Sequence, residues 1–490
     1  MTTDQHVDDR LAQLGQLVSG TIAPARERNF FEQHFDLPDN PFPPPGIADA
    51  AGEYPPLRDR DFDALINFIQ QGYSTGQRQF LVIKGEYGSG KTQMLRYVEH
   101  IVNRFMSKGD HAARAIYVER PRLNAQELNR TVLSTLGQDT VKKYVWFAVR
   151  GLLLTDLQEK PQRFLDLQKN LLAQRGQRSK SGRQRSSGQI EMWVDTDPAL
   201  TAPFDAVFNP QVVQDYRTFL DTLESKGWSR EDVRSYLATL LLQATQLPDL
   251  TSLGQTFVAL LLAPDDAAFT SWETLLGVTN SKATLSLRAP EFLRFLLRIM
   301  ALNGIAYVYM LLDEFEEVSQ TALLTLRQRQ DYIYTMREVL NSIEEGLSVI
   351  IAISPPGWDA LLQEGVPFAD VAAGIINLPR VELTDAIKLV QSYLDRERAG
   401  TTYPQGSLYP LNRELIAYIL DNFPRAAQRT PRSVVQFMHR LLDYAAEHDI
   451  TALTPDVAQP LLADFGAMKS GSERPVRGRR ASANAGTPTR

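Results

Sequence analysis

The stretch FLVIKGEYGSGKT, residues 80–92, decides the fold of this 490-residue chain. It begins with an apolar run, turns through three glycines and leads into a segment whose apolar residues recur at helical spacing. The pattern GxxxxGK[ST] is matched at every fixed position from Gly85 to Thr92. A strand, a glycine-rich turn and a helix in this order predict a P-loop, which binds the phosphates of a nucleoside triphosphate.

Each residue type of this loop has a physical reason. Glycines permit positive φ and close backbone approach, so successive N–H groups can surround a phosphate. We expect Lys91 to reach the β- and γ-phosphates and the Thr92 hydroxyl to coordinate Mg²⁺. The alternative, a glycine-rich turn without a ligand, is disfavoured by the strand and helix on either side. The predicted ATP-binding residues are Gly85, Glu86, Tyr87, Gly88, Ser89, Gly90, Lys91, Thr92 and Gln93.

A second motif is IAYVYMLLDEFEEV, residues 305–318, in which an apolar strand is followed by Asp313 and Glu314. This is the expected form of a Walker B site. Asp313 would hold Mg²⁺ through water, and Glu314 would orient and polarise the attacking water. The alternative is an ordinary acidic helix start, since carboxylates favour that position.

Two weaker signals follow. Ser354 ends the next apolar strand, in SVIIAISPPGW, and could equally be a serine that caps a turn. Arg432 begins a helical segment in the sequence TPRS, where a lid could turn it toward the phosphates. The alternative for Arg432 is a solvated arginine of a first helical turn, and Arg425 and Arg429 are nearby competitors.

The order of the elements predicts an α/β fold, in which a parallel sheet flanked by helices is interrupted by a large all-α insertion and followed by a helical lid. The polar and Pro-rich residues 1–57 form either a passive tether or a strap that lies across the next domain near a ligand pocket. The predicted divisions are an N-terminal polar and Pro-rich strap (1–57), a first core segment with the P-loop (58–139), a helical insertion (140–290), a second core segment with the Walker B motif (291–381), a helical lid (382–467) and a basic disordered tail (468–490).

Composition and charge exclude several classes. The chain has no cysteine, so disulfides, Cys-ligated metals and thiol nucleophiles are excluded. With 58 acidic and 52 Lys/Arg residues, the net charge is −6, so contact with DNA would need local basic patches. Two such patches are 173–188 and 469–490, which either bind phosphate backbones or are merely solubilising disordered stretches. No apolar leader or apolar run of about 20 residues is present, so we expect a cytoplasmic protein without a membrane span.

These motifs, in this order, resemble those of AAA+ ATPases. The TPRS helix and the segment ERPRLNAQELNRTVLSTLG resemble the origin-recognition-like branch. The segment LRFLLRIMALNGIAYVYMLLDEFEEV and the loop GEYGSGKT resemble the ATP-binding proteins of BREX-type phage-exclusion systems. The resemblance implies Ser354 as sensor 1, contacting the γ-phosphate and the attacking water, and Arg432 as sensor 2. It also implies an arginine finger that acts in trans. Arg380 is the only arginine between Ser354 and the lid, so this finger is poorly placed or absent, and Arg337 in the preceding helix is another candidate.

The sequence therefore predicts a Mg²⁺-dependent ATPase, with Lys91, Glu314, Ser354 and Arg432 as catalytic residues. It would act as a molecular switch or remodelling enzyme on DNA or a DNA-associated partner, in phage defence or another mobile-element context. Protein partners would bind the helical insertion, and an oligomer is possible. The alternative is a nucleotide-controlled interaction scaffold with little turnover. A small-molecule kinase is disfavoured, because no acceptor-binding lid precedes Asp313.

Overall fold

A computed structural model provides the coordinates. It describes residues 29–44, 58–109, 111–121, 125–159, 169, 198–263, 272–273, 275–276, 289–320, 325–363, 374–398, 403–424 and 429–472. The basic segment 173–188, Arg425 and the tail beyond Ser472 lie outside these residues. The chain divides into two compact units, one formed by residues 50–379 and the other by residues 1–49 together with 380–490.

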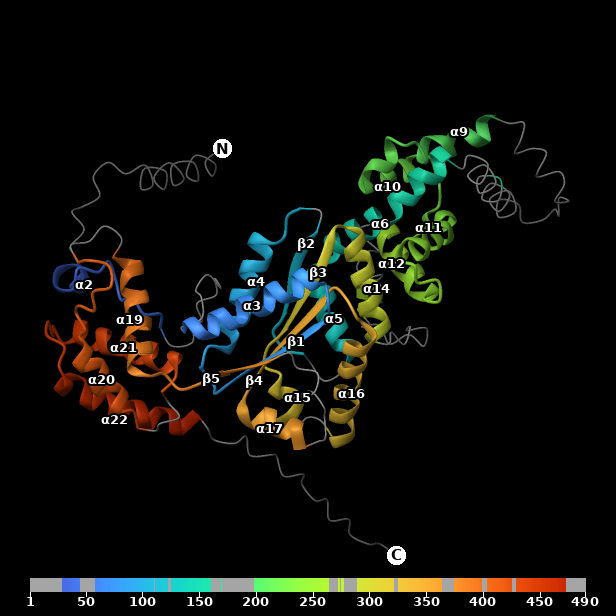
Figure 1. The fold of residues 1–490 in the computed structure, drawn as a ribbon. Helices are drawn as coiled ribbons and strands as arrows, with labels where there is room; N and C mark the ends of the chain where they lie inside the picture. The colour runs from blue at the N-terminus through green and yellow to red at the C-terminus, as the bar shows by residue number, and fades with distance from the viewer. Residues whose placement is uncertain are drawn as a thin grey trace, which may run out of the picture. The chain divides into compact units, whose positions relative to one another are not determined.

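The larger unit is built on a five-stranded sheet (Figure 1) in the order β2-β3-β4-β1-β5. All neighbouring strands are parallel. The strands are β1 (Gln79–Gly85), β2 (Ala112–Val118), β3 (Ile305–Leu312), β4 (Leu347–Ile353) and β5 (Gly374–Leu378). Each lies where an apolar run predicts a strand, and the predicted α/β class with a parallel sheet flanked by helices is confirmed.

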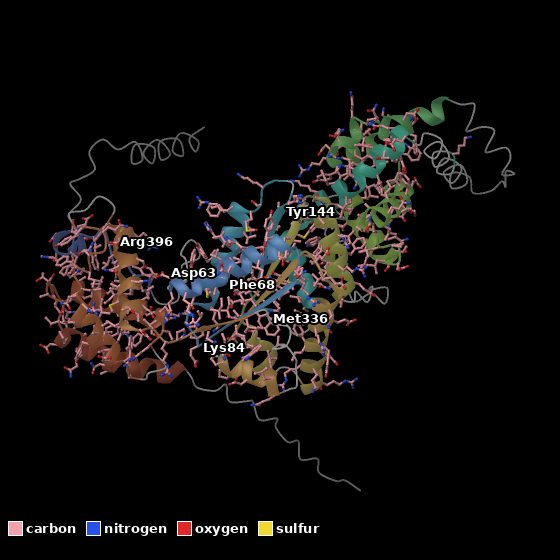
Figure 2. All side chains as sticks on the ribbon, in the orientation of Figure 1. Asp63, Phe68, Lys84, Tyr144, Met336 and Arg396 are labelled. Atoms are coloured by element: carbon pink, nitrogen blue, oxygen red, sulfur yellow. The ribbon has the colours of Figure 1, made fainter. Side chains whose placement is uncertain are left out.

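Apolar residues on both faces of β1, β2, β3 and β4 explain why these strands lie inside the unit. Leu81 and Ile83 of β1 pack on one side with α3 (Asp59–Thr75) and α4 (Lys91–Phe105). Phe80 and Val82 pack on the other side with a second set of helices. Phe68 of α3 and Met336 of α16 belong to these two cores (Figure 2). The second set comprises α5 (Ala125–Leu136), α14 (Ala289–Leu302), α15 (Glu316–Gln320), α16 (Leu326–Ser342) and α17 (Pro355–Gln363).

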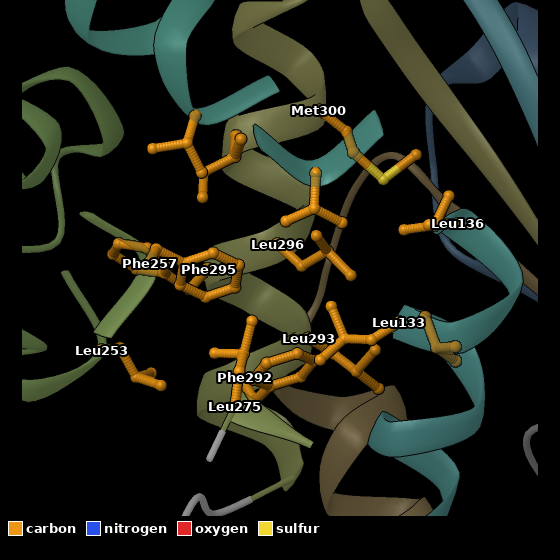
Figure 3. Close-up of a cluster of buried hydrophobic side chains, with 14 of the residues drawn as sticks. Leu133, Leu136, Leu253, Phe257, Leu275, Phe292, Leu293, Phe295, Leu296 and Met300 are labelled. Atoms are coloured by element: carbon orange, nitrogen blue, oxygen red, sulfur yellow. The ribbon is translucent and has the colours of Figure 1, made fainter. Parts of the chain in front are cut away.

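The predicted insertion is helical wherever the structure describes it, and it shares its core with the sheet. Phe257 stacks on Phe292 and Phe295 of α14, with ring centres 5.8 and 5.4 Å apart (Figure 3). These aromatic residues belong to the same hydrophobic cluster as Val82 of β1. The insertion is therefore anchored to the sheet through α14. Its elements are α6 (Gln138–Glu159), α9 (Pro198–Val207), the 3₁₀ turn η1 (Val212–Gln214), α10 (Tyr216–Ser225), α11 (Arg230–Thr245) and α12 (Thr251–Leu262).

One predicted helix of the insertion is wrong. The apolar spacing over 212–223 predicts a single helix, but the structure has η1 followed by α10. Asp215 separates them, because its backbone is extended and its carboxylate accepts a hydrogen bond from the N–H of Thr218. A side-chain cap of this kind begins a new helix and prevents the earlier turn from continuing.

The smaller unit joins both ends of the chain. Phe31, Phe35, Leu37 and Phe42 lie in one core with the C-terminal helices. Neither predicted role of the N-terminal segment, tether or strap across the next domain, describes residues 29–44. The last helix of this unit runs past the predicted end of the lid at residue 467. The helices are α2 (Phe30–His34), α19 (Leu383–Glu397), α20 (Arg413–Asp421), α21 (Pro431–Glu447) and α22 (Pro455–Ser472).

Polar contacts fix residues 29–44, which we call the N-terminal clip, onto α21. The Asn40 side-chain amide donates to the carbonyl of His439 at 2.9 Å and to the carboxylate of Asp443 at 2.6 Å. Nδ1 of His439 lies 2.8 Å from the carbonyl of Phe42. The N-terminal clip is thus an integral part of the C-terminal helical unit.

Candidate functional site

The predicted P-loop joins β1 to α4, and its three glycines serve two different purposes. Gly88 and Gly90 have φ of 78° and 101°, in the left-handed region that favours glycine. Gly85 has no such φ, but a Cβ there would lie 2.3 Å from Oγ of Ser89 and 2.9 Å from Cβ of Leu378. The loop therefore needs two glycines for its backbone turn and one for close packing.

Lys91 lies inside this loop, at the first residue of α4. Its side chain is buried, and Nζ donates to the carbonyls of Gly85 at 2.9 Å and Glu86 at 3.3 Å. Oγ of Ser89 is also buried and has no hydrogen-bond partner among the described residues. A buried ammonium group and an unsatisfied hydroxyl, at the N-terminus of a fifteen-residue helix, suit an anionic ligand.

The remaining predicted loop residues lie at the surface. Glu86, Tyr87 and Thr92 are exposed, and Gln93 is half-buried on α4. Tyr87 is 75% exposed, which leaves most of its ring open to solvent or to a ligand.

Asp313 follows β3 at the same edge of the sheet. It is only 2% exposed, and both carboxylate oxygens accept a hydrogen bond. Oδ1 accepts from the backbone N–H of Glu314 at 2.9 Å, and Oδ2 accepts from the Tyr117 hydroxyl at 2.8 Å. Burial, and next the Asp313 charge, raise the pKa of Tyr117, so its hydroxyl stays protonated and donates.

Glu314 adopts a φ of 49°, which is uncommon for a residue with a side chain. Its Oε2 accepts from Nε of Arg120 at 2.8 Å, and Arg120 lies 3.6 Å from Glu317 as well. Partial burial raises the pKa of Glu314, while Arg120 opposes the rise. Arg120 in turn has a raised pKa because of Glu314.

Arg120 and Tyr117 have no predicted role in the sequence, although Tyr117 is the last residue but one of β2 and Arg120 follows that strand by two residues. The available signal is positional: β2 pairs with β3 up to Val118 and Leu312, so residues next to Val118 lie beside Asp313 and Glu314. An arginine or tyrosine at the end of the strand that pairs with the Walker B strand is thus a candidate partner for its carboxylates.

Ser354 comes directly after β4. The strand register pairs Ile353 with Lys84, so Ser354 is level with Gly85 at the start of the P-loop. Its Oγ accepts from the N–H of Gly357 at 3.3 Å, and its carbonyl accepts from the N–H of Trp358 at 2.9 Å. Ser354 therefore caps α17, while its position beside the P-loop also suits the predicted contact with a phosphate.

Arg432 lies on the first turn of α21, in the smaller unit, and is exposed. Thr430 caps this helix by accepting from the N–H of Ser433. Of the two arginine-finger candidates, Arg337 is exposed on α16, and Arg380 is exposed where the C-terminal segment of the smaller unit begins. The structure thus brings together the residues of the P-loop, Asp313, Glu314 and Ser354 in one unit, and leaves Arg432 in the other.

The donor set at this edge fits Mg²⁺. The ion prefers hard oxygen ligands and usually keeps several waters, with one or two protein groups and the substrate phosphates completing its shell. Thr92 supplies a hydroxyl and Asp313 a carboxylate with lone pairs left for water. Within the described ranges, no three His, Asp or Glu side chains are grouped so that they could hold a metal ion by themselves.

Comparison with known proteins adds little. No protein-family model matches the chain, and no curated protein sequence does. A solved structure that it resembles is that of the Aeropyrum pernix ORC2 protein in ADPNP–ADP complexes, at 10% identity and a TM-score of 0.39, over 89% of this chain and 74% of that chain. At this level the match transfers neither activity nor residue roles. None of the helices that the structure describes is long and apolar enough to cross a membrane.

Proposed function

We propose that this chain is a Mg²⁺-dependent ATPase of the AAA+ kind. The observation that supports it most directly is that two features lie at one edge of the sheet. Lys91 lies inside a P-loop whose Gly88 and Gly90 have positive φ, and the Asp313–Glu314 pair directly follows β3. In open parallel sheets, ligands bind beyond the carboxyl ends of the strands. The same edge thus holds groups for phosphate, for a cation and for a water.

The proposed roles follow from this arrangement. Residues Gly85–Gln93 surround the phosphates, and Lys91 exchanges its backbone carbonyl partners for phosphate oxygens. Thr92 and Asp313 hold Mg²⁺, which neutralises charge developing on the phosphates. Glu314 accepts a proton from the attacking water as general base, after its carboxylate leaves Arg120.

Two further roles rest on sequence resemblance and position. Ser354, level with Gly85, is proposed to contact the γ-phosphate. Arg432 is proposed to reach the phosphates when the helical lid closes over ATP. An arginine that neutralises charge on the transferred phosphoryl group contributes substantially to the rate of such reactions.

For the process that ATP hydrolysis drives, the proposal names only a general class. We infer a switch or remodelling ATPase that acts on DNA or a DNA-associated partner complex in the cytoplasm, in phage defence or another mobile-element context. This proposal rests on the resemblance to origin-recognition-like and BREX-type ATP-binding proteins, and on the basic segments 173–188 and 469–490. Protein partners would bind the helical insertion.

A specific observation favours a second candidate, a nucleotide-controlled scaffold with little turnover. Glu314 is already paired with Arg120, so the group proposed to activate water is occupied in this structure. A protein that binds ATP but keeps this pair would change shape with nucleotide and hydrolyse slowly.

ATP hydrolysis, measured with and without duplex and single-stranded DNA at two salt concentrations, tests the proposal. Wild type should hydrolyse ATP in the presence of Mg²⁺, and Lys91→Ala should not. Stimulation by DNA should weaken as salt rises, since phosphate contacts release counterions, and should fall when 173–188 or 469–490 is deleted. ATP binding without hydrolysis in any condition would favour the scaffold, and no stimulation by DNA would remove DNA from the proposal.

A further inference from the structure

Tyr117 is the last residue but one of β2, and its ring lies on the α4 side of the sheet. Its hydroxyl donates to Oδ2 of Asp313 at 2.8 Å, in a buried position. Tyr117 pairs with Leu311 in the strand register, and Asp313 comes two residues after Leu311, directly beyond the end of β3, so the strand alternation brings it to the same face. The contact is a diagonal one between neighbouring strands, within the reach of an aromatic side chain.

Arg96 of α4 covers the ring of Tyr117. The guanidinium carbon lies 3.4 Å from the ring centre, and Nη1 of Arg96 forms an ion pair with Glu99 at 2.8 Å. A cation over an aromatic face is attracted by the ring, and more strongly where water is partly excluded. Arg96, which is oriented by its ion pair with Glu99, therefore holds one face of the Tyr117 ring.

Arg96 stands one helical turn after Thr92, and residues four apart lie on the same face of a helix. The contacts therefore run from the helix of Thr92 through Arg96 and Tyr117 to Asp313. Thr92 and Asp313 are the two residues proposed to hold Mg²⁺. Arg96 and Tyr117 thus connect the elements of both proposed ligands.

We propose that Tyr117 is a positioning residue for the Mg²⁺–nucleotide site, and that Arg96 acts through it. This inference rests on the proposed function. With Oδ1 bonded to the N–H of Glu314 and Oδ2 to Tyr117, the carboxylate of Asp313 has one fixed orientation. Its remaining lone pairs would accept a hydrogen bond from a water or coordinate a cation. Outer partners of this kind change metal affinity by about 10- to 100-fold when removed.

Two other tyrosines provide a matched comparison. Tyr309 and Tyr307 of β3 are equally buried on the same face, but their hydroxyls donate to the backbone carbonyls of Ile69 and Gln77. Tyr309→Phe removes a buried hydroxyl without touching either carboxylate. Any general cost of losing a buried tyrosine hydroxyl should appear in both phenylalanine variants.

The experiment measures binding of a fluorescent, slowly hydrolysed ATP analogue while Mg²⁺ is titrated, and again in EDTA. For Tyr117→Phe we expect the Mg²⁺ concentration at half-saturation to rise about 10-fold or more. Affinity in EDTA should stay within about twofold, because the P-loop contacts are intact. Tyr309→Phe should match wild type in both measurements, and circular dichroism should show that both variants are folded.

A second variant tests the role of Arg96. Arg96→Lys keeps the positive charge but loses the planar group that lies on the ring. It should raise the Mg²⁺ midpoint by a smaller factor than Tyr117→Phe. The double variant should show no further rise beyond Tyr117→Phe alone, since Arg96 acts through the tyrosine.

The outcomes separate the two proposals. If Mg²⁺ strengthens binding of the analogue to wild type and the midpoint of Tyr117→Phe is unchanged, this inference is overturned and the proposed ATPase stands. An equal rise in Tyr309→Phe would also overturn it, because the effect would then be structural. Wild type without any nucleotide binding would overturn both.

Discussion

Nε of Arg120 lies 2.8 Å from Oε2 of Glu314, so a side chain just beyond the edge strand β2 holds the carboxylate that is proposed to activate water. The two side chains are 50% and 42% exposed. Exposed ion pairs contribute about 0–1 kcal/mol, so this one can open at little cost. The pair is therefore suited to a group that must be released before it can act.

Arg120→Ala should raise the basal rate of ATP hydrolysis. Losing this exposed pair frees Glu314, and we expect kcat to rise by about two- to fivefold. The control is Arg230→Ala, which breaks another surface pair, with Glu224, far from the P-loop along the sequence. The measurement is kcat of ATP hydrolysis for both variants. If kcat falls in Arg120→Ala and not in Arg230→Ala, Arg120 assists the reaction and does not restrain Glu314.

Gly85→Ala should abolish ATP binding, because the new Cβ would lie 2.3 Å from Oγ of Ser89 and 2.9 Å from Cβ of Leu378. Gly151→Ala is the matched control, since its Cβ would meet nothing within 4 Å, on the exposed side of α6. That variant should bind ATP normally and melt at the same or a slightly higher temperature, since alanine favours a helix. Equilibrium binding of labelled ATP is measured for both variants. Normal binding by Gly85→Ala would show that the P-loop can rearrange to accommodate the new Cβ.

Phe35→Ala in the N-terminal clip should destabilise the smaller unit by about 3–5 kcal/mol, the usual cost of truncating a fully buried phenylalanine. Hydrogen exchange should speed up in α19, α20 and α21 and stay unchanged in β1, β3 and β4. The control is Phe105→Ala, whose ring is 70% exposed and whose loss should cost within about 0.5 kcal/mol. Unchanged protection of α21 in Phe35→Ala would show that the clip adds nothing to that unit.

Asp215→Ala should lower the melting temperature through α10. The hydrogen bond from the N–H of Thr218 lowers the pKa of Asp215, so the stabilisation is present above the unfolded pKa of about 3.9 and disappears as pH falls through the lower folded value. Removing an N-cap costs about 1 kcal/mol. The difference from wild type should be constant from neutral pH to about pH 5 and shrink in stronger acid. Asp215→Asn keeps the cap, and its melting should be nearly that of wild type at neutral pH.

The features of this fold that local pattern determines are visible in the sequence. The apolar run Leu347–Ile353 coincides with β4, and the spacing over Ala125–Leu136 coincides with α5. The P-loop is also local, since strand, glycines and helix are contiguous. Asp215 shows the limit: apolar spacing alone predicts one helix, and only the capping side chain reveals the break.

The features that depend on long-range pairing were not predicted. Nothing near Asn40 in the sequence indicates that its side chain meets His439 and Asp443. Tyr117 and Arg120 act on Asp313 and Glu314 because β2 pairs with β3 across a large helical insertion. Local sequence has no information on which strand a given strand will join, so the partners of both carboxylates emerge only in three dimensions.

ATP hydrolysis by Glu314→Gln tests whether Glu314 is the general base of an ATPase. The amide keeps the shape of the side chain but cannot act as general base, so multiple turnover should fall by about 10²- to 10⁴-fold while ATP stays bound. The control is Glu317→Gln, which alters the other carboxylate near Arg120 and should hydrolyse ATP within about fivefold of wild type, since exposed ion pairs contribute little. Turnover by Glu314→Gln at the wild-type rate would contradict the proposal that Glu314 activates the attacking water.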